Sequence, residues 1–157
     1  MSALGDEILK RGFEGFQSKA LERHVQELAD REEIKELTAR YAHRISRGQS
    51  VADMFTDDAA FIIRVPGKPV QEVRGREQID KFYGAIVSDP KPTLPTIHNH
   101  VIAISADEAT ELCWLEVRTM DGNVLSSAGS GCYEDRLRRE NGRWKFVVRE
   151  ITMTGQM

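Results

Sequence analysis

Residues 96 to 154 carry the feature that most restricts the fold, a series of four long strand candidates separated by short turn signals. Asp-Gly-Asn at 121–123 and Glu-Asn-Gly at 140–142 are strong hairpin signals, because Gly and Asn tolerate the positive φ of tight turns. Consecutive strands joined by such turns pair antiparallel, so this half of the chain predicts a sheet. The four candidates are Thr96 to Ser105, Glu108 to Met120, Val124 to Arg139 and Arg143 to Thr154.

An amphipathic helix is predicted between residues 30 and 48. Asp30 and Glu33 form a capping-box pattern at its start, and Gly48 is a typical stop. Apolar side chains recur inside it at steps of three and four, which places them on one helix face. These residues are Ile34, Leu37, Tyr41 and Ile45. We therefore expect the apolar face of this helix, which includes the hydroxyl-bearing Tyr41, to pack against the sheet.

The remaining segments complete an α+β pattern. Residues 4 to 28 indicate an interrupted helix with Leu9, Phe13, Phe16 and Ala20 on one face. Residues 59–65 and 70–74 favour two short strands, and 76–87 favour a helix. A proline-rich loop covers 89–95. Helices followed by a run of long strands predict an α+β domain rather than alternating units.

The composition narrows the classes of function. The chain has 157 residues, enough for one domain with a substantial core, and a net charge of −3 that disfavours a nucleic-acid partner. We expect no membrane span, because no apolar run approaches about 18 residues. No apolar signal core is seen near the start. Cys113 and Cys132 lack metal or disulfide spacing and indicate free thiols in a reducing cytosol.

Several short motifs resemble one family when they are taken in order. Ala-Asp-Arg-Glu-x-Ile-x-x-Leu-x-x-Arg-Tyr-Ala at 29–42, Phe-Thr-Asp-Asp-Ala at 55–59 and Gly-Arg-Glu-Gln-Ile at 75–79 are typical of SnoaL-like domains. The segments 132–139 and 142–146 resemble the end of such domains. These domains belong to the nuclear transport factor 2-like superfamily, with scytalone dehydratase, bile-acid dehydratase and hexachlorocyclohexane dehydrochlorinase.

The resemblance implies a fold and a domain division. We expect a cone-shaped, curved antiparallel or mixed sheet wrapped around the N-terminal helices. Residues 29–157 would form the SnoaL-like domain, and residues 1–28 would be an N-terminal helical extension. The family commonly forms dimers or trimers, so a homodimer or homotrimer is expected.

The resemblance also implies catalytic residues, because family dehydratases use a His–Asp pair assisted by a helix Tyr. His98 matches the strand His, Tyr41 the proton-donating Tyr, and Ser46 takes the place of the dyad Asp. A neutral imidazole suits proton abstraction because its usual pKa of about 6.5 lies near working pH. If Asn99-His100 is aligned with the family motif instead, the family His falls on Pro95 and no dyad His remains.

Other side chains are expected to bind substrate. Alternate residues of the last strand share a face, and Arg149 among them can bind an anion or stabilise negative charge. His98 and His100 are expected to point the same way, but spacing places no carboxylate with them, so no metal is predicted. The expected lining residues are Arg149, Trp114, His100, Ile151, Met153 and Phe61, with Val147 on the face of Arg149.

Two main hypotheses of function follow, beside a third, a pure interaction module that uses the outer face of the sheet, which has little specific support. The first is a cofactor-independent lyase or isomerase, dehydratase- or cyclase-like, that abstracts a proton from a small, partly apolar cyclic substrate in the cone. The second is a non-catalytic protein of the same fold that binds a small molecule. Ser46 motivates the second, because a hydroxyl cannot stabilise an imidazolium as a carboxylate does.

Overall fold

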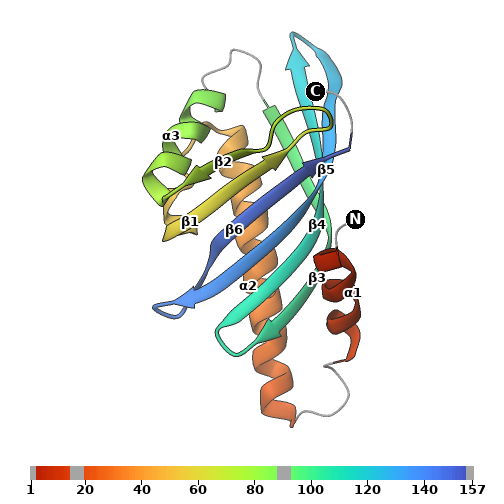
Figure 1. The fold of residues 1–157 in the computed structure, drawn as a ribbon, viewed down its shortest axis with the longest axis vertical. Helices are drawn as coiled ribbons and strands as arrows, with labels where there is room; N and C mark the ends of the chain where they lie inside the picture. Colours follow the sequence, from red (N-terminus) through yellow and green to blue (C-terminus); the bar gives the residue numbers. More distant parts are fainter. Residues whose placement is uncertain (1–2, 15–19, 88–92, 155–157) are drawn as a thin grey trace.

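The computed structural model describes residues 3–14, 20–87 and 93–154. Three α-helices and a 3₁₀ turn are joined to six strands (Figure 1). The helices are α1 (Ala3–Glu14), α2 (Leu21–Ser46), η1 (Ala52–Met54) and α3 (Arg76–Val87). The strands are β1 (Phe55–Arg64), β2 (Gln71–Arg74), β3 (Thr93–Ser105), β4 (Glu108–Asp121), β5 (Val124–Glu140) and β6 (Arg143–Met153).

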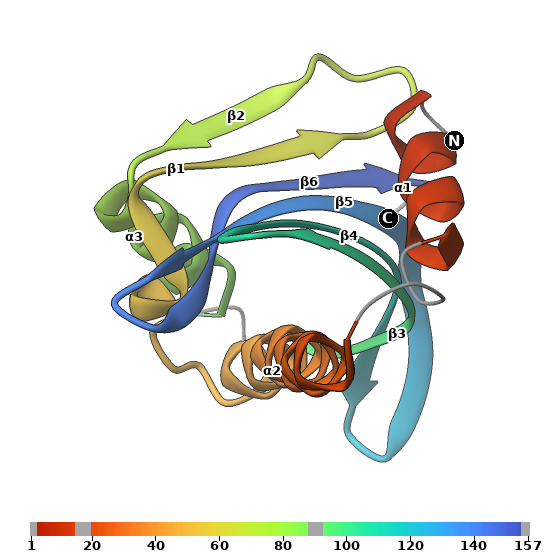
Figure 2. The ribbon, with the colours of Figure 1, turned by 90° about the horizontal axis from the view of Figure 1, so that it is seen from below.

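The six strands form one mixed sheet that is not closed, in the order β2-β1-β6-β5-β4-β3. β1 and β6 run parallel, and the other neighbours run antiparallel. The sheet curves around α2, which lies on its concave side with α3, whereas α1 lies outside the curve (Figure 2). The expected α+β fold with a curved sheet around helices is confirmed. Residues 89–92 of the expected proline-rich loop and the position of Phe16 lie outside the described residues, whereas Pro95, which was expected in that loop, lies in β3.

The hairpins follow the sequence signals. Asn141 and Gly142 both have positive φ, 52° and 75°, in the loop that joins β5 to β6. Glu140 and Arg143 pair directly across this loop, so the two residues between them form the tight turn that Asn-Gly favours. Gly122, with φ 59°, likewise opens the two-residue loop between β4 and β5.

The main core lies between α2, α3 and the concave face of the sheet. The apolar stripe of α2 is buried as expected, with Ile34 fully buried and Tyr41 2% exposed. Full burial of one such side chain contributes about 1.5–3 kcal/mol. A second, smaller cluster lies on the convex side, where Ile8 of α1 packs on Leu112 and Cys132. Both cysteines are free and buried.

The start of α2 corrects the sequence prediction. The helix begins at Leu21 rather than at Asp30, and it runs without a break to Ser46. Asp30 is a buried residue inside the helix, where it accepts from Nε1 of Trp144 at 3.3 Å and pairs with Arg139 at 2.7 Å. The expected division between residues 28 and 29 therefore falls within one continuous helix. Gly48, with φ 64°, follows the end of α2 as predicted.

None of the described helices is long and apolar enough to cross a membrane.

A pair of glycine substitutions tests the packing of the sheet. A Cβ at Gly131 of β5 would lie 2.8 Å from the Thr152 carbonyl oxygen and 2.9 Å from Cδ1 of Ile151. Gly131→Ala should therefore lower the free energy of unfolding by about 1–3 kcal/mol, measured by urea denaturation. Gly84→Ala is the control, because a Cβ there meets nothing within 4 Å and Gly84 lies inside α3. It should raise stability by about 0.5–1 kcal/mol; equal effects of both changes would contradict this packing.

Candidate active site

A bulge in β3 separates the two strand histidines. His98 pairs with Trp114 and Val101 pairs with Leu112, so two residues of β3 stand opposite one residue of β4. Asn99 lies in this bulge with φ 58°, a left-handed conformation that Asn tolerates better than most residues. An extra residue reverses the alternation of side chains. His98 and His100 therefore face opposite sides of the sheet, and the prediction that they point the same way is wrong.

His98 lies on the convex side of the sheet. Its neighbour Ile97 packs against the main core, and its own ring approaches Glu116, with Nε2 3.7 Å from Oε1. The His98 side chain is 39% exposed. Trp114, directly opposite, packs against the convex cluster under α1. The structure therefore does not bring His98 or Trp114 to the concave interior, where both were expected.

His100 takes the interior position and has a buried carboxylate partner. Its Nδ1 lies 2.8 Å from Oε1 of Glu111, which is fully buried on β4. Thr38 of α2 donates its hydroxyl to the other oxygen, Oε2, at 2.8 Å. Glu111 is thus held from both sides, by the helix and by the bulged strand. A carboxylate in this position accepts from one imidazole nitrogen and leaves the other available for proton transfer.

A row of three charged residues crosses the concave face of the sheet. Glu111, Asp135 and Arg149 are direct neighbours on β4, β5 and β6, and all three are fully buried. Nη1 of Arg149 lies 3.1 Å from Oδ2 of Asp135. Burial raises the pKa of Asp135 well above its usual value; the Arg149 charge opposes this rise and Glu111 adds to it.

Aromatic rings enclose the Arg149 guanidinium. Its Cζ lies 3.8 Å from the ring centre of Tyr133, 4.2 Å from that of Tyr41 and 4.4 Å from that of Phe146. Such stacking is favourable for a cation that is removed from water. Within the described residues, however, none of the three guanidinium nitrogens has a partner at hydrogen-bond geometry, and neither does either oxygen of Asp135. These buried donors and acceptors can still bind a polar group.

The tyrosines form the other polar element of the interior. The hydroxyl of Tyr41 hydrogen-bonds that of Tyr83 from α3, and the two rings meet edge to face at 5.5 Å. Burial raises the pKa of both Tyr41 and Tyr83 well above the usual value, so both phenols are protonated at neutral pH. Phe61 of β1 packs on Tyr83, with ring centres 5.1 Å apart.

A second bulge sets the inward face of β6. Phe146 pairs with Leu137 and Val148 with Arg136, so the alternation is interrupted at Val147. Arg149 is fully buried beyond this point, and Ile151 and Met153 are buried with it. Val147 does not share this face and is only half-buried, which corrects the expected grouping. As a result, Arg149, Ile151 and Met153 join Tyr41 and Phe61 in the interior.

The Ser46 hydroxyl is hydrogen-bonded within its own helix. It donates to the backbone carbonyl oxygens of Ala42 at 3.2 Å and His43 at 3.0 Å. This back-bonding is usual for Ser within a helix. The structure shows no contact between Ser46 and His98 or His100 in the described part of the chain. The carboxylate that accompanies a histidine is supplied instead by Glu111 on a neighbouring strand.

Five polar residues of the interior were not predicted, although two of them leave a signal in the sequence. Glu111 lies between Ala109 and Cys113 on an otherwise apolar strand face, and Asp135 lies between Tyr133 and Leu137. A charge at an inward position of such an alternation indicates a buried, partnered group. Thr38, Tyr83 and Tyr133 leave no comparable signal, because their types are common in cores.

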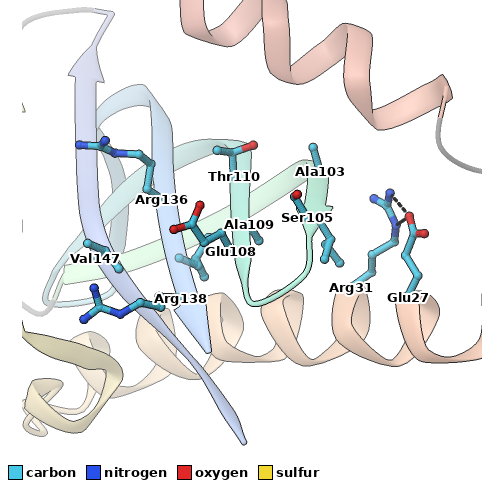
Figure 3. Close-up of a pocket in the computed structure, with 12 residues that line it drawn as sticks. Glu27, Arg31, Ala103, Ser105, Glu108, Ala109, Thr110, Arg136, Arg138 and Val147 are labelled. Atoms are coloured by element: carbon cyan, nitrogen blue, oxygen red, sulfur yellow. Dashed lines mark hydrogen bonds and ion pairs between the residues drawn. The ribbon is translucent and has the colours of Figure 1, made fainter. Parts of the chain in front are cut away.

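A separate cavity opens at the β3–β4 hairpin. It has a volume of about 350 Å³, and Ser105, Thr110, Arg136 and Arg138 are among its lining residues (Figure 3). Arg31 and Glu27 of α2 line it on the other side of the hairpin and pair with each other at 2.7 Å. Of the residues expected on the inner face only Val147 lines this cavity, and Glu111, Asp135 and Arg149 do not line it. We therefore assign the candidate site to the concave interior, where His100, Glu111 and Arg149 lie on one face of the sheet.

The curved sheet, the long helix in its hollow and the polar interior define a nuclear transport factor 2-like protein. A family model for the SnoaL-like domain matches residues 26–150, so the chain belongs to the SnoaL-like family. The match covers most of α2 and every strand except the last residues of β6. A search of curated proteins finds no match.

Solved structures support the same fold. A protein of unknown function from Mycobacterium tuberculosis is 24% identical, with a TM-score of 0.73 over 82% of this chain and 73% of that one. A nuclear transport factor 2-like protein from Novosphingobium aromaticivorans is 23% identical, with a TM-score of 0.72 over 87% and 90%. A candidate scytalone dehydratase from the same organism is 19% identical, with a TM-score of 0.70 over 82% and 87%. At these identities the likeness shows the fold alone.

The buried ion pair gives a direct stability test. Arg149→Met or Asp135→Leu alone leaves an uncompensated buried charge and should lower the free energy of unfolding by about 3–5 kcal/mol. The double variant removes both charges and should cost less than either single change. Urea denaturation of the four proteins measures this coupling. Additive effects of the two single changes would show that the charges do not depend on each other.

Proposed function

We propose that this protein is a cofactor-independent lyase or isomerase that moves a proton on a small, partly apolar cyclic substrate. The observation that carries the proposal is the buried pair of His100 and Glu111 on the same concave face as the Tyr41–Tyr83 hydroxyls and Arg149. The structure supports His100 in place of His98 as the base, because His98 lies on the other face of the sheet.

Each residue has a role that its environment supports. Glu111 accepts from Nδ1 of His100, which leaves Nε2 to take a proton from carbon next to a carbonyl. Glu111 also stabilises the imidazolium that forms, as the family's helix Asp would do. Thr38 holds Glu111 in place from α2. In this way a carboxylate on a strand takes over the role that sequence comparison assigned to Ser46.

When the proton leaves carbon, negative charge develops on an oxygen of the substrate. The site therefore needs groups that stabilise an oxyanion or a departing oxygen. Tyr41 and Tyr83 remain protonated, since burial raises the pKa of both phenols, and the hydroxyl that accepts in their mutual hydrogen bond keeps its own O–H to donate. Arg149 adds a buried positive charge whose N–H groups have no hydrogen-bond partner among the residues that the structure describes. Charge that develops near such groups is stabilised more strongly in a dry interior than in water. Ile151, Met153 and Phe61 supply apolar walls.

Substrate is expected to enter beside His100, whose side chain is 17% exposed, while Glu111 next to it is fully buried.

We also propose that the protein works in the cytosol as a homodimer or homotrimer. The free, buried Cys113 and Cys132 support a reducing compartment. Leu21, Val25 and Leu28 on α2 are 79%, 59% and 47% exposed, which is compatible with a subunit contact. Sedimentation equilibrium measures the assembly state.

The two histidines form a matched pair for testing the mechanism. A panel of cyclic β-hydroxy ketones and cyclic ketones in D₂O is followed by proton NMR for loss of water and for deuterium uptake. On a compound that the wild type turns over, His100→Gln should lower kcat/KM by about 100-fold or more, since general-base catalysis contributes that much. His98→Gln should stay within about twofold of wild type, because its ring faces the convex side.

Circular dichroism of both variants controls for folding. Undiminished turnover in folded His100→Gln would reject His100 as the base.

The second candidate function is ligand binding without turnover. It is favoured by the hydrogen bond that already joins the Tyr41 hydroxyl to Tyr83. Binding of panel compounds by ligand-observed NMR, with no product and no deuterium uptake, would support that candidate and reject the enzyme.

A further inference from the structure

Three side chains of different chemistry converge on the concave face beside the bulge. His100, Glu111 and Cys113 each place one candidate ligand atom within 4.8 Å of the other two. Glu111 and Cys113 are two residues apart on β4, so they share its inward face, and both are fully buried. His100 reaches them from β3 because of the Asn99 bulge. Strand pairing thus brings to a histidine the carboxylate and thiol that sequence spacing did not place there.

The geometry points to a metal site, and we propose that His100, Glu111 and Cys113 bind a divalent ion of the zinc class. Imidazole nitrogen, carboxylate oxygen and thiolate sulfur are the ligands that zinc takes in proteins, whereas calcium and magnesium do not use sulfur. Three protein ligands leave a fourth tetrahedral position for water or a small molecule. Zinc bonds of about 2.0–2.3 Å bring ligand atoms to within about 4 Å of one another, so a small inward shift of the side chains completes the site.

The charges and the free thiol support this assignment. Glu111 and a Cys113 thiolate together neutralise a divalent ion. This lowers the free-energy cost of burying the ion in an interior that already contains Asp135 and Arg149. Within the described residues the Cys113 thiol has no hydrogen-bond partner, whereas Cys132 donates to a backbone oxygen at 3.7 Å. Burial raises the pKa of Cys113, so the ion must displace the thiol proton when it binds.

The site goes beyond the proposed function and does not depend on it. A neutral imidazole has one lone pair, and an ion bound to His100 occupies the electrons that a general base needs. Metal binding and base catalysis are therefore mutually exclusive uses of His100. If the protein is the proposed enzyme, zinc inhibits it at this site; if it is a binding protein, the metal site remains.

Cobalt titration tests the site directly. The protein is first reduced and then freed of metal by dialysis against a chelator. It is titrated with Co²⁺ in the absence of oxygen, and the absorption spectrum is recorded at each step. Wild type should bind one equivalent and develop a thiolate-to-cobalt charge-transfer band in the near ultraviolet. Zinc should displace the cobalt. Competition with a chromogenic chelator gives the affinity for zinc.

Variants of the two cysteines and of the two strand histidines serve as tests and matched controls. Cys113→Ser should abolish the charge-transfer band, and both Cys113→Ser and His100→Gln should lower zinc affinity about tenfold or more. Cys132→Ser and His98→Gln should retain the band and the affinity, since Cys132 and His98 lie on the convex side. Circular dichroism confirms folding of each variant.

A wild-type protein that gives no charge-transfer band overturns the proposal, whatever the variants do. So does a band that persists in Cys113→Ser or disappears in folded Cys132→Ser. The readout is absorption rather than turnover, so failure of the proposed enzyme activity leaves this test unaffected. Loss of turnover on adding zinc, reversed by chelator, would show that both uses of His100 occur in one protein.

Discussion

The structure depends on two opposite charges placed where a core would ordinarily be apolar. Arg149 and Asp135 sit side by side on β6 and β5 with no access to solvent. Each charge alone costs several kcal/mol to bury, so the pair requires a closed environment that supplies compensation. Tyr41 from α2, Tyr133 from β5 and Phe146 from β6 provide it by stacking on the guanidinium. The curve of the sheet and the position of α2 across it are what bring these rings together.

Two β-bulges decide which side chains share that environment. The bulge at Asn99 turns His100 inward and leaves His98 on the convex face, and the bulge at Val147 turns Arg149 inward. Bulges re-aim side chains in this way near functional sites in many sheets. The result is a polar row from His100 through Glu111 and Asp135 to Arg149, with two phenols above it. This row contains the proposed base, its carboxylate partner and the cation proposed to stabilise an oxyanion, and His100 and Glu111 are also two of the three proposed metal ligands, with Cys113 as the third.

Local patterns predicted the architecture well and the site only in part. The stripe of α2, the Asn-Gly turn and the bounds of α3 depend on contacts close in sequence, and all were anticipated. The start of α2 was missed because Asp30 and Glu33 form a capping-box pattern that indicates a helix N-terminus, whereas both residues lie inside a helix that begins at Leu21. Tyr41 and Arg149 were placed in the interior, but His98, Trp114 and Ser46 were not found there. A bulge changes the facing of every later residue, and pairing across the sheet rather than local sequence determines where it falls.

The bulge at Asn99 places His100 against Glu111 inside the sheet, and this contact can be measured directly. Nitrogen-15 NMR of protein labelled at histidine reports which ring nitrogen carries a proton, with His98 and a Glu111→Gln variant for comparison. The contact predicts that Nδ1 of His100 is protonated and hydrogen-bonded at neutral pH, and that the signal changes in Glu111→Gln. A bare Nδ1 with the proton on Nε2, unaffected by Glu111→Gln, would show that His100 does not donate to Glu111.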